Sequence, residues 1–252
     1  MQFSKYQGAG NDFIIIDNRD GAFSLEEPRF IRHLCDRHFG IGADGLLSIE
    51  KDFVLRIFNA DGSEPKMCGN GVRCAFDFLF KLLNLSEMQL FVAGRVITGR
   101  REGDNVAVAL GAPILVHWPI LLEARELYVV NTGVPHALLF VEDLESIDVI
   151  EQGRRVRSAS AFVPEGVNAT FVKVDSKDAI SVRTYERGVE GETLSCGSGA
   201  AAAAWAARRL YGLEERIAVS TRSSSTLLFS FTGDEIEMVG PAHLVFSGDC
   251  VC

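Results

Sequence analysis

The sequence predicts an α+β fold with two pseudo-symmetric lobes, each a mostly antiparallel barrel of strands wrapped around one central helix. Two observations lead to this prediction. Strand-like runs mostly follow one another instead of alternating with helices, which is typical of α+β proteins rather than of a doubly wound sheet. A Cys-Gly-x-Gly turn followed by an apolar segment occurs twice, at Cys68 and at Cys196, about half a chain length apart. With 252 residues, the chain is long enough for two lobes that each bury a core.

The predicted strands are apolar runs, rich in β-branched or aromatic residues, that end at Gly, Asp or Asn. They lie at residues 13–17, 45–50, 53–59, 105–110, 127–133, 137–142, 169–174, 179–186, 226–231 and 235–240. The segments around "EGDN" (102–105) and "TGDE" (232–235) have the pattern of antiparallel hairpins.

Four helices are predicted, at residues 27–38, 70–83, 146–157 and 198–211. The second and fourth follow the Cys-Gly-x-Gly turns and lack a wide polar face, which is typical of a buried helix. Residues 200–207 are all alanine except Trp205. We therefore expect these two helices to be the central helices of the lobes.

The repeat extends beyond the two turns. "EPKMCGNG" aligns with "ETLSCGSG", "GNDFIIID" with "GVPHALLFV", and "FNADGSE" with "YERGVEGE", at nearly the same offset. One structural unit used twice accounts for this pattern.

Composition narrows the class of protein. The chain is 47% apolar and 23% charged, and its net charge of −9 comes without any Lys/Arg-rich run. We therefore expect no nucleic-acid partner. The N-terminal segment lacks the apolar core of a signal peptide, and no run of 18 uncharged apolar residues occurs, so we expect a cytoplasmic protein with no membrane partner.

The chain has six cysteines, which in a cytosolic protein of this length predict free thiols rather than disulfides. The pairs Cys35/His38 and Cys68/Cys74 have no second pair at zinc-ligand spacing, so no metal site is predicted. Four cysteines lack the Cys-Gly-x-Gly context and are expected to be structural: Cys35, Cys74, Cys250 and Cys252.

The two remaining thiols stand where a helix begins. The first N–H groups of a helix have no partner within it and carry a partial positive charge, so we expect them to lower the pKa of Cys68 and Cys196 and to bind an anion. If the lobes face each other, one thiolate can remove the proton α to a bound carboxylate while the opposite thiol returns one, which inverts the stereocentre. The same N–H groups would stabilise the enediolate charge.

On these motifs the sequence resembles the diaminopimelate epimerase family of cofactor-independent amino-acid epimerases. The motifs are "KYQGAGNDFIIID", "DRHFGIGADGLL", "RIFNADGSEPKMCGNGVRC", "GVPH", "GVNATFV", "YERGVEGETLSCGSGAAAA" and "GPAHLVFSG". The resemblance implies an N-terminal lobe of residues 1–114, to which a last strand at about 243–252 returns, and a C-terminal lobe of residues 115–242. It also implies a homodimer and interconversion of LL- and meso-diaminopimelate, on the route to lysine and peptidoglycan, without pyridoxal phosphate or another cofactor.

The resemblance also implies roles for individual residues. Cys68 and Cys196 match the base/acid pair, and His136 matches a histidine beside the thiols. The backbone donors to the carboxylate at the reacting carbon match Gly69, Asn70, Gly197 and Ser198. The polar groups that recognise the substrate and fix its distal amino-acid end match Asn11, Asn59, Asn168, Glu186 and Arg187.

Two positions differ from a common family pattern and leave substrate selectivity open. Many members have Asn at the position of Val134, and some have Gln at the position of Gly45. The alternative functions are a cofactor-independent racemase of another amino acid, a thiol redox protein and a non-catalytic amino-acid-binding protein. A dinucleotide site at "GAG" (8–10) is not expected, because the motif precedes its strand and opens no helix.

Overall fold

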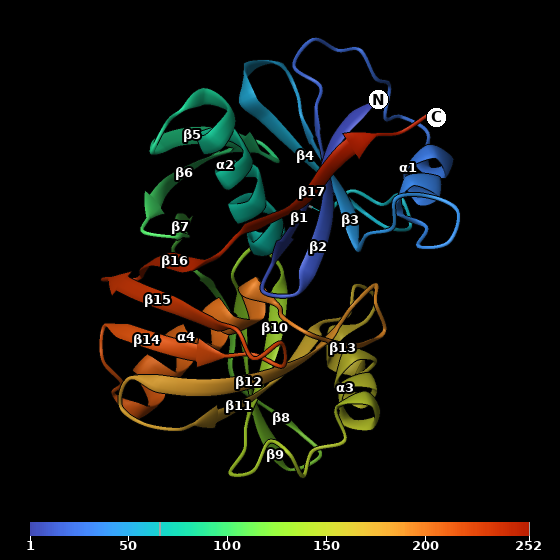
Figure 1. The fold of residues 1–252 in the computed structure, drawn as a ribbon. Helices are drawn as coiled ribbons and strands as arrows, with labels where there is room; N and C mark the ends of the chain where they lie inside the picture. The colour runs from blue at the N-terminus through green and yellow to red at the C-terminus, as the bar shows by residue number, and fades with distance from the viewer. Residues whose placement is uncertain (66, 252) are drawn as a thin grey trace. The chain divides into compact units, whose positions relative to one another are not determined.

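The computed structural model describes residues 1–65 and 67–251, which fold into two compact units (Figure 1). Unit 1 comprises Met1–Val108 and Gly240–Cys252, and unit 2 comprises Ala109–Val239. Strands far outnumber helices in the described residues, and the predicted α+β class is confirmed.

The elements of unit 1 are β1 (Gln2–Gly8), β2 (Asn11–Asp17), α1 (Pro28–Cys35), β3 (Gly45–Ile49), β4 (Val54–Asn59), α2 (Gly69–Leu83), β5 (Glu87–Val92), β6 (Arg95–Glu102) and β17 (His243–Asp249). β7 (Asn105–Gly111) and β16 (Glu235–Pro241) are the strands through which the chain passes between the units. The elements of unit 2 are β8 (Ile114–Leu122), β9 (Arg125–Asn131), β10 (Pro135–Phe140), α3 (Val149–Arg157), β11 (Asn168–Val174), β12 (Ala179–Glu186), β13 (Gly191–Thr193), α4 (Gly197–Tyr211), β14 (Arg216–Ser220) and β15 (Thr226–Thr232).

In unit 1, α2 is the central helix. It packs against β1, β2, β3, β4, β6 and β17, and its first nine residues, 69–77, are all buried. The burial expected of this helix is confirmed there but not in its last turn, where Leu82 is 49% exposed. β17 pairs antiparallel with β1, so the C-terminal strand lies in unit 1 (Figure 1).

In unit 2, α4 is the central helix and packs against strands β9 to β12 and β14 to β15. Residues 199–207 are fully enclosed, and the alanine side chains allow the surrounding strands to approach the helix closely. Trp205, in the middle of the helix, is only 4% exposed. The prediction that this alanine run forms a buried helix is confirmed.

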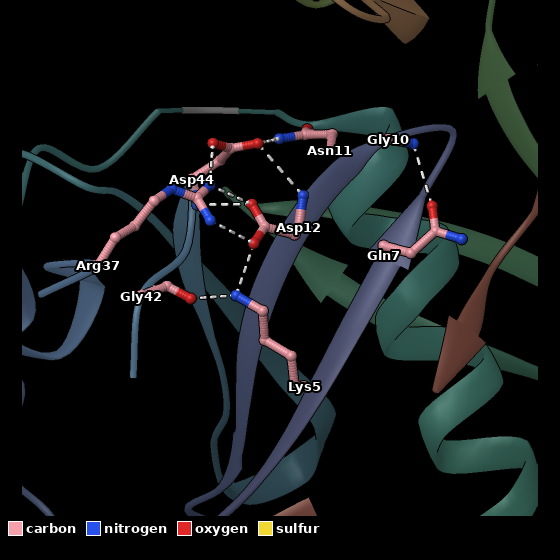
Figure 2. Close-up of polar contacts among 8 residues, drawn as sticks. All are labelled: Lys5, Gln7, Gly10, Asn11, Asp12, Arg37, Gly42 and Asp44. Carbon is pink, nitrogen blue, oxygen red and sulfur yellow. Dashed lines mark hydrogen bonds and ion pairs between the residues drawn. The ribbon is translucent and has the colours of Figure 1, made fainter. Parts of the chain in front are cut away.

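The hairpin of β1 and β2 places Asn11 at the start of its strand. The two residues of the turn, Ala9 and Gly10, have φ values of 54° and 84°, the left-handed region used by the tight turns that match the twist of a hairpin. The Gly10 N–H donates to the side-chain oxygen of Gln7 at 3.0 Å, which holds the turn (Figure 2).

The expectation of free thiols holds for four cysteines, Cys35, Cys68, Cys74 and Cys196. It is wrong for Cys250, which is disulfide-bonded. Cys252 lies outside the described residues. None of the helices described here is long and apolar enough to cross a bilayer.

Candidate active site

Cys68 is the residue from which α2 begins. Its backbone is extended (φ −145°, ψ 103°), and its carbonyl accepts the first hydrogen bond of the helix, from the Val72 N–H at 2.9 Å. The half-buried thiol therefore stands beside the first turn of the helix, where the positive end of the dipole lies.

The Asn11 side chain lies against this thiol. Its oxygen Oδ1 is 3.8 Å from Cys68 Sγ and accepts a hydrogen bond from Asn70 Nδ2 at 3.4 Å. Its nitrogen Nδ2 donates to Oδ2 of Asp44 at 2.9 Å (Figure 2). Hydrogen bonds thus connect three residues that the sequence assigned to the site of unit 1: Asn11, Cys68 and Asn70.

Asn59 has a local role in the structure. Its side-chain amide donates to the Ser63 hydroxyl at 2.9 Å, and its backbone N–H donates to the Ser63 carbonyl, as expected of an asparagine that stabilises a turn. Its role in binding substrate stays a prediction. Across the sheet from Asn59, Gly45 has no room for a side chain, because a Cβ there would lie 2.4 Å from the Phe58 carbonyl oxygen.

Unit 2 repeats the geometry of unit 1 at Cys196. The backbone is again extended (φ −120°, ψ 104°), and the Cys196 carbonyl accepts from the Ala200 N–H at 2.9 Å. The thiol is buried, and its sulfur lies 3.5 Å from Oγ of Ser198, the second residue of α4. Each unit therefore presents one cysteine as the cap of its central helix.

The lowered pKa expected for Cys196 is wrong for this structure. Burial raises the pKa of the thiol well above its ordinary value, and the nearby Glu186 carboxylate raises it further. The Ser198 hydroxyl and the Gly199 N–H lower it by less. Cys196 is therefore held as a thiol, with the Glu186 carboxylate beside it as a hydrogen-bond acceptor.

His136 is fully buried in unit 2 and hydrogen-bonded on both ring nitrogens. Nε2 lies 2.9 Å from Ser198 Oγ and 3.4 Å from Asn168 Nδ2, and Nδ1 lies 3.1 Å from Thr170 Oγ1. Burial, and secondarily the charge of Arg187, lower the pKa of His136 to about 3. The imidazole is therefore neutral near pH 7, and it links to Cys196 through the Ser198 hydroxyl.

Asn168 connects this group to the end of β12. β10 and β11 pair in parallel with His136 opposite Asn168, and Oδ1 of Asn168 accepts from the Arg187 backbone N–H at 2.7 Å. The Arg187 side chain is exposed, and its Nη1 donates to the Glu165 carbonyl at 2.9 Å. Glu186 accepts a short hydrogen bond from the Thr193 hydroxyl.

Comparison with known proteins agrees with this arrangement. The family pattern described as "Diaminopimelate epimerase" matches residues 3–116 and 128–245. The chain belongs to the diaminopimelate epimerase family. A diaminopimelate epimerase of Aquifex aeolicus is 40% identical over 98% of this chain and 97% of its own length, and one of Archaeoglobus fulgidus is 39% identical over 98% and 95%.

Solved structures show the same fold at low sequence identity. A hydroxyproline epimerase from Agrobacterium vitis superposes with a TM-score of 0.76 at 15% identity, covering 98% of this chain and 90% of that one. At such low identity, the similarity shows a shared fold and does not identify the substrate.

The structure adds residues that sequence reasoning missed. Asp12, Arg37 and Asp44 form the polar group that holds Asn11, Thr170 is a hydrogen-bond partner of His136, and Gly199 leaves room for its ring. The first three lie inside "GNDF", "DRHF" and "GADG", motifs shared with the diaminopimelate epimerase family, which was the signal that could have found them. Among the residues placed by the structure, no cluster of three His, Cys, Asp or Glu side chains is arranged to hold a metal ion.

Proposed function

We propose that this protein is an isomerase that interconverts LL- and meso-diaminopimelate with Cys68 and Cys196 as a pair of acid/base groups. The observation that carries the proposal is the repeated geometry of the two thiols: each is the extended residue immediately before the buried central helix of its unit. The relatives named diaminopimelate epimerase, similar over nearly the whole chain, supply the substrate.

The chemical step requires a base on one face of the α-carbon and an acid on the other. In one direction, the Glu186 carboxylate takes the proton of Cys196, and the resulting thiolate removes the α-proton of the substrate. Cys68, as a thiol, then donates its proton to the opposite face, which leaves the inverted centre, a thiolate at Cys68 and protons on Cys196 and Glu186. After product release, Glu186 loses its proton to solvent and Cys68 takes one up, which restores the resting site. The reverse direction runs with the two roles exchanged.

The helix N-termini supply the charge stabilisation that this step needs. Backbone N–H groups at Gly69 and Asn70, and at Gly197 and Ser198, bind the α-carboxylate in this proposal. As the α-proton leaves, negative charge moves onto that carboxylate as an enediolate, and fixed N–H dipoles stabilise it without reorganising.

The distal end of the substrate needs groups that recognise a second ammonium and carboxylate. Arg187 suits the carboxylate, because its exposed guanidinium uses Nη1 for Glu165, and among the described residues Nη2 donates to no acceptor. Side-chain oxygens of Asn11, Asn59 and Asn168 are the proposed contacts for the remaining polar groups.

We further propose that units 1 and 2 correspond to lobes of residues 1–114 with 243–252 and residues 115–242. The proposal also includes a cytoplasmic homodimer with no nucleic-acid or membrane partner. The acidic net charge of −9 supports the exclusion of nucleic acid.

Exchange of the α-proton tests the proposal directly. The reduced protein is incubated with LL-diaminopimelate in D2O, and deuterium incorporation and formation of the meso isomer are followed together. We expect both. Absence of exchange with LL- and meso-diaminopimelate would reject this function.

A racemase of another amino acid on the same fold is the second candidate, favoured by Val134 and by Gly45, where a side chain has no room. A panel of other amino acids in the same assay distinguishes it. A redox protein would instead cycle a disulfide without exchange, and a binding protein would be stabilised by ligand without exchange.

A further inference from the structure

The Asn11 side chain has a fixed orientation between Asp44 and Cys68. An ionised carboxylate only accepts hydrogen bonds, so the 2.9 Å contact with Asp44 requires the NH2 end of the Asn11 amide to point toward Asp44. The oxygen end must then point toward Cys68 Sγ, at 3.8 Å. Figure 2 shows the amide beside Asp44 in this orientation.

Asp44 is itself held on both oxygens. Oδ1 accepts from Arg37 Nη2 at 2.9 Å, and Oδ2 accepts from the Asp12 backbone N–H at 3.2 Å as well as from Asn11 (Figure 2). Arg37 also binds both oxygens of Asp12, at 2.8 and 3.0 Å, and Lys5 pairs with Asp12 at 2.6 Å. The carboxylate that orients Asn11 is therefore the outer member of a network anchored on β1, β2 and the loop between α1 and β3.

The other neighbour of Asn11 is oriented in the same sense. Arg73, fully buried in α2, donates from Nη2 to Oδ1 of Asn70 at 2.9 Å, which turns the Asn70 NH2 group toward Asn11. Two side-chain amides therefore stand in line between the cation Arg73 and the anion Asp44, and both present their dipoles in the same direction.

We propose that Asp44 is a positioning residue for Cys68: by fixing the Asn11 amide it presents an acceptor oxygen to the thiol and keeps Cys68 protonated and aimed as the acid of the resting site. The inference rests on the proposed catalytic role of Cys68. In this proposal Asp44 acts on Cys68 through Asn11, and Arg37 holds Asp44 in place. Neither residue touches the substrate.

Peptide-resolved alkylation measures the protonation of the Cys68 thiol directly. The rate at which iodoacetamide modifies Cys68 is followed by mass spectrometry from pH 6 to 10. An Asp44→Asn substitution frees the Asn11 amide to turn an N–H toward the sulfur, which favours the thiolate. We expect the midpoint of the Cys68 profile to fall by about half to one pH unit, the size typical of one lost hydrogen bond.

Loss of the Asp44 charge alone would also lower the midpoint of the Cys68 profile. Two comparisons therefore separate this charge effect from the reorientation of Asn11. In 1 M NaCl the Debye length is about 3 Å, and a shift caused by orientation persists there while a through-solvent charge effect shrinks. Arg37→Lys keeps the charge but loses the two-pronged hold on Asp12 and Asp44, and we expect a smaller fall of the midpoint in the same direction. The groups in Coulomb contact with Cys68 along α2, Arg73 and Cys74, are unchanged in all variants.

Asp17→Asn is the matched control. It removes a half-exposed carboxylate at the far end of β2 that pairs with Arg19 at 2.7 Å, and the Cys68 profile should not move. An unchanged midpoint in folded Asp44→Asn, or a shift that disappears in 1 M NaCl, overturns the inference. If Asp44→Asn does not fold, an unchanged midpoint in Arg37→Lys overturns it instead. Because alkylation requires no turnover, this result is independent of whether the wild type exchanges the α-proton of diaminopimelate.

Discussion

Nε2 of His136 lies 2.9 Å from Oγ of Ser198, and the same hydroxyl lies 3.5 Å from Sγ of Cys196. A buried imidazole thus reaches the thiol of the N-cap residue of α4 through one hydroxyl. Because burial lowers the pKa of His136 to about 3, the ring accepts no proton in the folded protein near neutrality.

This buried histidine makes stability depend on pH. The unfolded chain protonates His136 below about pH 6.5 while the folded protein does not, so the free energy of unfolding should fall as the pH drops from about 6.5 toward 3. The full loss is several kcal/mol, since one pKa unit corresponds to about 1.4 kcal/mol. Urea denaturation of the wild type and His136→Gln between pH 7 and 4 measures the effect. The variant should show the shallower pH dependence, and equal slopes would contradict the assignment.

Glu186→Gln should separate the reactivity of Cys196 from its use in catalysis. Removing the negative charge lowers the pKa of the thiol, so alkylation of Cys196 at pH 8 should become faster. The variant lacks the acceptor for the thiol proton, so α-proton exchange should fall about 100-fold or more. Glu142→Gln, at an exposed position, is the control and should change neither rate. Slower alkylation in Glu186→Gln would show that the carboxylate does not act on this thiol.

Each of the two capping thiols should be indispensable. Cys68→Ala and Cys196→Ala each remove one acid/base group, and we expect either substitution to abolish epimerisation, measured by formation of the meso isomer. Cys35→Ala is the control, because it removes a buried sulfur of α1 at a cost of about 1 kcal/mol in stability but leaves both capping thiols in place. Full epimerase activity in either single-thiol variant would exclude the two-base mechanism.

Gly199 has no space for a methyl group. A Cβ there would lie 3.0 Å from both Cε1 of His136 and Oγ1 of Thr170. We expect Gly199→Ala to reduce the free energy of unfolding by about 1–3 kcal/mol, since the buried imidazole must move. In Gly191→Ala the added methyl would meet nothing nearer than 4.0 Å, so its effect should stay within about 0.5 kcal/mol. Equal urea midpoints for the two variants would contradict this packing.

Some elements were easier to predict than others for a local reason. The helices α2 and α4 begin at glycine turns and continue as apolar runs, so neighbouring residues alone indicate them. β1 was missed, and β17 was expected only from the family resemblance, not from its own residues. β1 contains Lys5, whose burial depends on Asp12 in the next strand, and β17 is mostly exposed and forms by pairing with β1 at the opposite end of the chain.

What the sequence by itself determined is the repeated unit: a cysteine, a glycine turn and a buried helix, used twice, because the signals for each lie within a few residues of one another. Only the tertiary structure decided the environment of each thiol. The helix dipole acts within one turn and predicted a lowered pKa for Cys196, whereas desolvation and the Glu186 charge, which arise from strands around α4, raise it. The orientation of Asn11 beside Cys68 likewise depends on Asp44, which lies 33 residues further along the chain and reaches Asn11 only when β2 and β3 pair.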